Sequence, residues 1–177
     1  MPHIKVHEKE FMPYISSDEI EKQVRRVADE ITRDYAGKKP LFVAILNGAF
    51  IFAADLFKYL QMEVDMGFIK LSSYESVKTR GKLITAIGLD AELYGRDVIL
   101  VADIVDTGKT LTHFLPHLEH QHPASLKIVS LLHKPSASIF PVQIDYLGFT
   151  IPDKFVIGYG LDYDGLGRNI KEIYQQV

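Results

Sequence analysis

Residues 16–37 have the hydrophobic pattern of an amphipathic helix, with apolar side chains recurring at three- and four-residue intervals. Ser16 and Glu19 have the spacing of a capping box at the start of this segment. Gly37 and Pro40 follow it and predict its end, because neither residue readily continues a helix. The apolar positions fall on one helical face, which we expect to face a core: Ile20, Val24, Val27 and Ile31.

The rest of the chain alternates between short apolar runs and helical patterns, which predicts strands alternating with helices. Strands are expected at 41–46, 63–71, 83–89, 97–103 and 125–132, with short strands near 145–149 and 154–159. Helices are expected at 49–60 and 108–119, and the polar, basic segment 72–82 is predicted to be a long mobile loop. This order is typical of an α/β protein, and we expect one domain, 1–177, with an open, largely parallel sheet flanked by helices.

The segment VILVADIVDTGKTL, residues 98–111, leads from a predicted strand into a predicted helix. A nucleoside-triphosphate loop requires glycine at position 103, and that position is Asp103, so this motif is absent. Hydroxyl groups, backbone N–H groups and the helix dipole still form a cradle for one compact phosphate. The residues of this cradle are Thr107, Gly108, Lys109 and Thr110.

Two carboxylates, Asp103 and Asp106, flank the predicted phosphate cradle. Like charges repel, so we do not expect them to bind the phosphate. They suit ribose hydroxyls, a metal ion or a proton on a ring nitrogen, and the combination therefore suggests a sugar phosphate. The alternative is that Asp106 and Thr107 only cap the helix.

Charge and composition exclude several other kinds of site. A net charge of −3 gives no reason to expect nucleic acid as a partner. The absence of cysteine excludes disulfides, thiolate zinc sites and a cysteine nucleophile. The N-terminus has no apolar signal segment, and the longest uncharged apolar stretch, 40–54, is interrupted by Asn47 and Gly48. We therefore expect a cytoplasmic protein that does not bind membranes.

Residues 98–111 resemble the phosphoribosyl pyrophosphate motif of type I phosphoribosyltransferases. Four further segments resemble hypoxanthine-guanine phosphoribosyltransferases in order and spacing: AILNGAFIFAADL, KLSSYES, SLLHKPSA and GFTIPDKFVIGYGLDYDGLGRN. The resemblance implies the type I fold, with a small hood formed by terminal segments. It also implies Mg²⁺-dependent purine salvage, in which a 6-oxopurine, hypoxanthine or guanine, reacts with phosphoribosyl pyrophosphate to give IMP or GMP. The same resemblance implies assembly as a homodimer or homotetramer.

The resemblance assigns the base-binding and proton-transfer roles. Asp106 corresponds to the general base that takes the N7 proton of the purine, and Asp103 to one of two acids that hold the ribose hydroxyls. Lys134 corresponds to the donor to the six-position oxygen. Phe155 corresponds to a ring that stacks on the base, and the backbone of Val156 to a contact with the base edge.

The resemblance also assigns residues that contact pyrophosphate, the leaving group, and Mg²⁺, and residues of a mobile loop. Asp162 corresponds to a Mg²⁺ ligand and Arg168 to a pyrophosphate contact. Ser73 and Tyr74 correspond to the tip of a mobile loop that closes over the site. The pyrophosphate loop of the family, which tends to contain a non-proline cis peptide, corresponds to Leu46, Asn47 and Gly48.

Ala102 departs from the family motif, which has an acid at this position to hold the ribose together with the next residue. Hydrogen bonds to charged groups contribute about 1.5–3 kcal/mol, so the missing carboxylate could weaken binding of phosphoribosyl pyrophosphate. Two alternatives therefore stay open: a regulatory protein that binds this ligand or a nucleotide, and an enzyme for another base, such as xanthine or a pyrimidine.

Four histidines lie in or just after the predicted helix 108–119, a spacing that resembles a metal site: His113, His117, His120 and His122. Pro116 is expected to interrupt the helix that would align His113 with His117. We therefore interpret these histidines as solvated residues of a helix end rather than as metal ligands.

Overall fold

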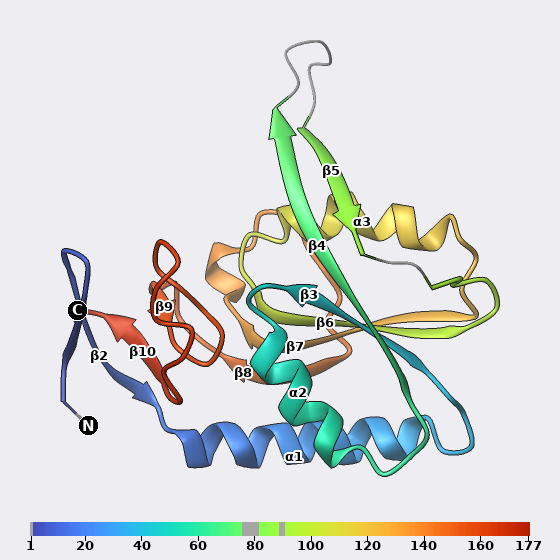
Figure 1. Ribbon diagram of the computed structural model, residues 1–177, viewed down its shortest axis with the longest axis horizontal. Coiled ribbons are helices and arrows are strands. Elements are labelled where there is room, and N and C mark those ends of the chain that lie inside the picture. Colours follow the sequence, from blue (N-terminus) through green and yellow to red (C-terminus); the bar gives the residue numbers. More distant parts are fainter. Residues whose placement is uncertain (1, 76–81, 89–90) are drawn as a thin grey trace.

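A six-stranded sheet forms the centre of the computed structural model, which describes residues 2–75, 82–88 and 91–177 (Figure 1). The strand order is β5-β4-β3-β6-β7-β8. Five strands are parallel, and β5 pairs antiparallel with β4 at one edge, which confirms the predicted open, largely parallel sheet. The bounds are β3 Leu41–Leu46, β4 Asp65–Glu75, β5 Lys82–Ile87, β6 Asp97–Val105, β7 Ser125–His133 and β8 Tyr146–Thr150.

The central strands are buried on both faces because helices cover the sheet from both sides. On β3, Phe42 and Ala44 belong to the core next to α1 (Ser17–Asp34) and α2 (Phe50–Tyr59). Their neighbours Leu41 and Val43 belong to the core next to α3 (Lys109–Glu119). This double burial explains why the strands appear in the sequence as continuous apolar runs rather than as alternating ones.

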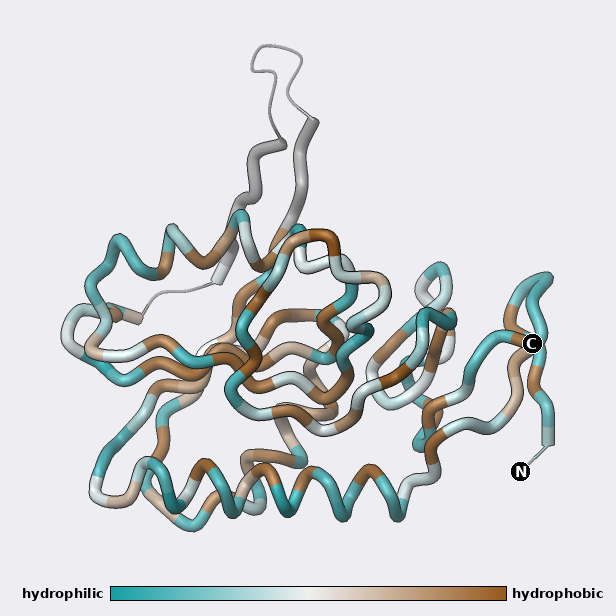
Figure 2. The backbone as a smooth tube through the Cα atoms, turned by 180° about the vertical axis from the view of Figure 1, so that it is seen from behind, coloured by the Kyte–Doolittle hydropathy of each residue, from teal (hydrophilic) through white to brown (hydrophobic). Residues whose placement is uncertain are grey.

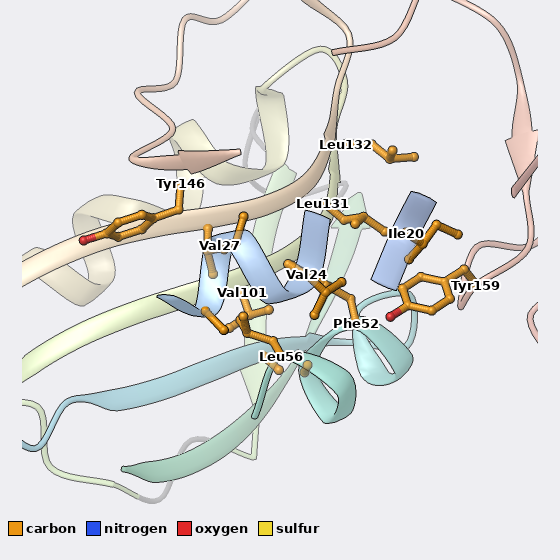
Figure 3. Packing of buried hydrophobic residues seen from close by; sticks show 14 of the residues in the cluster. Ile20, Val24, Val27, Phe52, Leu56, Val101, Leu131, Leu132, Tyr146 and Tyr159 are labelled. Atoms are coloured by element: carbon orange, nitrogen blue, oxygen red, sulfur yellow. The ribbon is translucent and has the colours of Figure 1, made fainter. Parts of the chain in front are cut away.

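Helix α1 has the predicted start and the predicted buried face. Ser16 Oγ accepts a hydrogen bond from the N–H of Glu19 at 3.3 Å, and the Glu19 carboxylate accepts one from the N–H of Ser16 at 2.9 Å. Figure 3 shows Ile20, Val24 and Val27 packed against side chains of α2 and the sheet. None of the helices within the described ranges is long and apolar enough to cross a membrane.

A second, antiparallel sheet brings the two ends of the chain together, with strand order β1-β2-β10-β9. It confirms the hood expected from the terminal segments, and both views show it at one end of the molecule (Figures 1 and 2). The bounds are β1 Ile4–Val6, β2 Lys9–Ile15, β9 Val156–Ile157 and β10 Ile173–Gln176.

The sequence pattern missed three of these strands and made the fourth too long. Pro13 obscures β2, since proline lacks the N–H group that a strand normally donates. In the structure Pro13 lies opposite Tyr174, where the register between β2 and β10 shifts, so the irregular pairing accommodates it. The predicted strand 154–159 is shorter, covering only Val156–Ile157.

The predicted loop 72–82 was also wrong at both ends. Residues Lys70–Glu75 of β4 pair with Lys82–Ile87 of β5, so polar residues lie in a hairpin, and the central part, 76–81, lies outside the described residues. Strand pairing satisfies the backbone whatever the polarity of the side chains. Polar composition was therefore a poor guide to structure in this segment.

Candidate active site

The loop between β6 and α3 forms an open pocket of about 230 Å³ lined by residues 104–111. Gly108 occupies the N-cap position of α3 with a φ of 78°, and no side chain caps the helix there. One residue earlier, the Thr107 hydroxyl accepts a long hydrogen bond of 3.4 Å from the N–H of Lys109, so the capping alternative holds in part for Thr107. The Asp106 carboxylate instead accepts a hydrogen bond from Lys134. The backbone N–H groups of the first helical turn and the positive end of the helix dipole suit the binding of a phosphate in this pocket.

The backbone around Gly108 is tightly packed. A Cβ atom at Gly108 would lie 2.0 Å from the carbonyl oxygen of Phe140. The N–H groups of Ile139 and Phe140 both donate to the carbonyl of Thr107, at 3.1 and 2.9 Å. The loop is thus held in place by a distant segment of chain as well as by its own turn.

The pairing of β6 with β7 brings Asp106 next to Lys134. The N–H of Lys134 donates to the carbonyl of Val105 at 3.0 Å, and its Nζ donates to Asp106 Oδ2 at 3.4 Å. Lys134 is only 5% exposed, whereas the carboxylate side chain of Asp106 is 46% exposed. The lysine is therefore fixed by the protein, while the carboxylate can reach a ligand.

Asp153 is a second partner of Lys134 that the sequence reasoning missed, with its Oδ1 3.6 Å from Nζ. A buried ammonium requires compensating charge or hydrogen bonds, and Asp153 supplies part of it from the loop after β8. The N–H of Ile151 donates to the carbonyl of His133 at 2.8 Å, which holds this loop beside Lys134. The position of Asp153 two residues before Phe155 was the available sequence signal.

The two predicted purine-binding residues in the hood follow directly from that loop. Phe155 is 40% exposed, and Val156 is buried at the start of β9. The carbonyl of Phe155 accepts a hydrogen bond from the N–H of Gln176 at 2.8 Å, which ties this segment to the C-terminal strand. Phe155 therefore has ring surface that is free to stack on a planar ligand.

A second group of predicted residues gathers around the turn after β3. A Cβ atom at Gly48 would lie 1.7 Å from Asp103 Oδ2, and one at Gly160 would lie 2.2 Å from the carbonyl oxygen of Gly48. Arg168 donates to the carbonyl of Gly160 at 2.7 Å and pairs with Asp162 at 2.8 Å. The sequence-distant residues assigned to ribose, pyrophosphate and metal thus form one cluster, and the peptide bond between Leu46 and Asn47 in this turn is cis.

Burial raises the pKa of Asp103 from its usual 3.8 to about 6. The N–H of Ile104 and the charge of Arg168 act in the opposite direction, and the neighbouring carboxylate of Asp162 raises the pKa further. The charged form of Asp103 is therefore disfavoured until hydroxyl groups or a cation approach it.

The donor set of this cluster fits Mg²⁺ bound together with a phosphorylated ligand. The described residues contain no group of three or more histidine or acidic side chains that could hold a metal ion by themselves. Mg²⁺ is commonly bound by one or two carboxylates plus substrate phosphates. Asp162, whose side chain is 29% exposed beside Asp103, can supply such a carboxylate.

Ser73 and Tyr74 lie within β4, paired with β5, rather than at the tip of a loop. Ala102 is 2% exposed and packs in the apolar core next to α3, where it takes the place of a charged group. Helix α3 continues through Pro116, so the predicted interruption was wrong. The four histidines are exposed, and the rings of His113, His117 and His120 each bond to a backbone carbonyl.

Comparisons with known proteins agree with this geometry. The family model of the phosphoribosyl transferase domain matches residues 16–164. A hypoxanthine-guanine phosphoribosyltransferase of Lactococcus lactis is 40% identical over 157 residues, covering 88% of this chain and 85% of the relative. The corresponding protein of Bacillus subtilis is 39% identical, covering 90% and 89%. Another relative, the bifunctional protein TilS/HprT of Listeria innocua, is 38% identical over 90% of this chain. The match covers only 25% of that longer protein.

Solved structures give the same result. A hypoxanthine-guanine phosphoribosyltransferase of Bacillus anthracis, with a HEPES molecule in its active site, superimposes with a TM-score of 0.86 at 34% identity, covering 94% of this chain and 98% of the other. A hypoxanthine phosphoribosyltransferase of Trypanosoma cruzi in a ternary substrates complex also has a TM-score of 0.86, at 35% identity over 93% and 94% of the two chains.

Proposed function

Since the chain belongs to the hypoxanthine-guanine phosphoribosyltransferase family, we propose that it is a purine salvage enzyme. It transfers the 5-phosphoribosyl group from phosphoribosyl pyrophosphate to hypoxanthine or guanine, which forms IMP or GMP and releases pyrophosphate. The observation that carries this proposal is the pair of Asp106 and Lys134 beside the phosphate pocket. A proton acceptor and a fixed cation there match the two polar edges of a 6-oxopurine.

The purine is held by three contacts. Lys134 donates a hydrogen bond to the six-position oxygen, which disfavours adenine because adenine has an amino group there. Phe155 stacks on the ring, and the backbone of Val156 meets its edge. Asp106 accepts the N7 proton as the base attacks the ribose, a role that is typically worth about 10²–10⁴-fold in rate.

The phosphoribosyl group spans the two halves of the site. The 5′-phosphate lies at the first turn of α3, against Thr107, Gly108, Lys109 and Thr110. Asp103 accepts hydrogen bonds from the ribose hydroxyls, and Arg168 and the Leu46–Gly48 turn bind the pyrophosphate. Asp162 helps to hold Mg²⁺, which when bound neutralises part of the charge on the leaving group.

The first experiment is steady-state turnover with phosphoribosyl pyrophosphate, Mg²⁺ and each of hypoxanthine, guanine, xanthine and adenine. We expect turnover with hypoxanthine and guanine and none with adenine; competition among the three 6-oxopurines ranks them. Asp106→Asn should lower kcat by about 10²–10⁴-fold, whereas Glu63→Gln, in an exposed ion pair with Lys39, should not change it. Absence of turnover with all three 6-oxopurines at saturation would contradict the proposal.

The buried Ala102 is the observation that favours a second candidate, a regulatory protein that binds phosphoribosyl pyrophosphate or a nucleotide. Calorimetric binding of phosphoribosyl pyrophosphate without turnover in any of these assays would support it. Turnover by the natural chain would instead show that the reaction does not require an acid at position 102.

Assembly and loop movement are proposed on the resemblance alone. We infer a homodimer or homotetramer, and closure of the segment that carries Ser73 and Tyr74 over the bound substrates. Light scattering across a concentration series measures the assembly state directly.

A further inference from the structure

Three consecutive residues at the N-terminal hairpin contact two aromatic rings of the C-terminal part of the hood. Lys9 Nζ lies over the ring of Phe155 at 5.0 Å and over the ring of Tyr163 at 4.4 Å from the ring centroids. The Tyr163 hydroxyl donates to the carboxylate of Glu8, and the ring of His7 meets Tyr163 edge-to-face at 5.5 Å. The hairpin thus touches both the predicted base-stacking ring and the residue after Asp162.

The rings of Phe155 and Tyr163 form an aromatic cluster with a third ring, that of the buried Phe11. Phe155 and Tyr163 meet edge-to-face, with centroids 5.6 Å apart and an interplanar angle of 79°. Phe11, which is fully buried, lies 6.3 Å from each of them. Lys9 and Phe11 are two positions apart on β2, so both point to the same face of the hood sheet.

Lys9 belongs to a hairpin that precedes the part of the chain matched by the family model. The match to the family model begins at residue 16, so the hairpin lies outside it. His7 and Glu8 form a two-residue turn between the paired residues Val6 and Lys9, and His7 has a φ of 51°. A left-handed conformation is uncommon for residues other than glycine, and here it occurs in the residue whose ring meets Tyr163.

We propose that Lys9 is a positioning residue for the purine base. Its ammonium group over one face of the Phe155 ring fixes the ring orientation, and the remaining exposed surface of the ring stacks on the base. This inference rests on the proposed function and assigns a role in base binding to the N-terminal segment.

The alternative is that Lys9 only stabilises the hood. A purely structural role would lower the melting temperature and affect both substrates. A positioning role acts on the base alone, so it should raise KM for hypoxanthine and leave KM for phosphoribosyl pyrophosphate within about twofold. Arginine also places a cation over an aromatic ring, so Lys9→Arg should retain the effect of lysine.

The test compares the full chain with Lys9→Gln, Lys9→Arg and Lys5→Gln. Lys5 is an exposed lysine on β1 of the same hairpin and controls for net charge. We expect Lys9→Gln to raise KM for hypoxanthine by about three- to tenfold, as a cation–aromatic contact of ordinary strength predicts. Kcat should change less than KM, and Lys9→Arg and Lys5→Gln should resemble the natural chain.

Three results would overturn the inference: an unchanged KM for hypoxanthine in Lys9→Gln, an equal rise in Lys5→Gln, or a parallel rise in both KM values with a lower melting temperature. If the natural chain shows no turnover, the proposed function fails, and calorimetric binding of GMP decides the role of Lys9 separately. Lys9→Gln should weaken GMP binding by the same factor. Equal affinity in the variant, or no GMP binding by the natural chain, would overturn the inference.

Discussion

Asp103 is a carboxylate whose surroundings oppose its charge in the free protein. Its Oδ2 lies against the backbone of Gly48, where a side chain at position 48 would collide with it. Burial raises its pKa to about 6, above the usual 3.8. A group of this kind destabilises the fold when it is ionised and is suited to a site where hydroxyl groups or a cation arrive with the ligand.

The stability of the free protein should therefore depend on pH through Asp103. Since its pKa is raised on folding, the contribution of Asp103 to the free energy of unfolding is greatest below about pH 4, where the carboxyl is protonated in both states. This contribution is lost as the pH rises through about 6. At about pH 8, Asp103→Asn should raise the free energy of unfolding by roughly 2–3 kcal/mol. The gain should vanish near pH 4.

Urea unfolding of the natural chain and Asp103→Asn at both pH values measures this difference. Asp164→Asn, at an exposed aspartate, provides the control and should show the same pH dependence as the natural chain. A gain in Asp103→Asn that is equal at both pH values would mean that the carboxyl does not titrate as its burial implies.

At the scale of elements, the conformation of the loop between β6 and α3 depends on contacts made by another segment. Gly108 has a φ of 78°, and its Cα faces the carbonyl of Phe140. Gly37 has a nearly identical φ of 76° at the end of α1, but an added Cβ there would meet nothing within 4 Å. Comparing the two glycines therefore separates the cost of placing a side chain at positive φ from the cost of its collision with a neighbouring backbone.

Gly37→Ala should cost about 1–2 kcal/mol of stability, since only the left-handed conformation is unfavourable. Gly108→Ala should cost more, by a further 1–3 kcal/mol or so, because the backbone of residue 140 must move. It should also raise KM for phosphoribosyl pyrophosphate, which Gly37→Ala should not. Equal losses of stability with equal KM values would show that the contact with Phe140 is readily relieved. Thermal unfolding and steady-state kinetics supply both measurements.

At the scale of the molecule, the site lies where the carboxyl ends of β3, β6 and β7 meet the hood. The central sheet carries the loop between β6 and α3 and also Lys134, whereas the segment between β9 and β10 carries Asp162 and Arg168. A ligand that contacts both parts should hold them together and stabilise the folded chain by mass action.

We therefore expect phosphoribosyl pyrophosphate with Mg²⁺ to raise the melting temperature. A ligand at 100 times its Kd contributes about 2.7 kcal/mol, which corresponds to roughly 5–10 °C for a chain of this size. Mg²⁺ alone should have little effect, because the described residues provide no three-ligand cluster. A shift of the same size in the presence of EDTA would contradict a metal-dependent mode of binding.

The elements that depend on local chemistry could be predicted from the order of residues alone. The capping box and apolar face of α1, the buried runs of the parallel strands and the strand–loop–helix form of residues 98–111 were all predicted and confirmed. These features follow from side-chain period and turn chemistry within a few residues.

Contacts between residues far apart in the chain could not be predicted in this way, because they depend on how the elements pack. The N-terminal strands were missed because Pro13 makes β2 irregular, and β2 is ordered by pairing with the C-terminal β10. Asp153 could be recognised only from its contact with buried Lys134. Lys9 could be recognised only from its position over the rings of Phe155 and Tyr163. The packing of segments far apart in the chain creates these contacts, and no local period of apolar and polar residues encodes them.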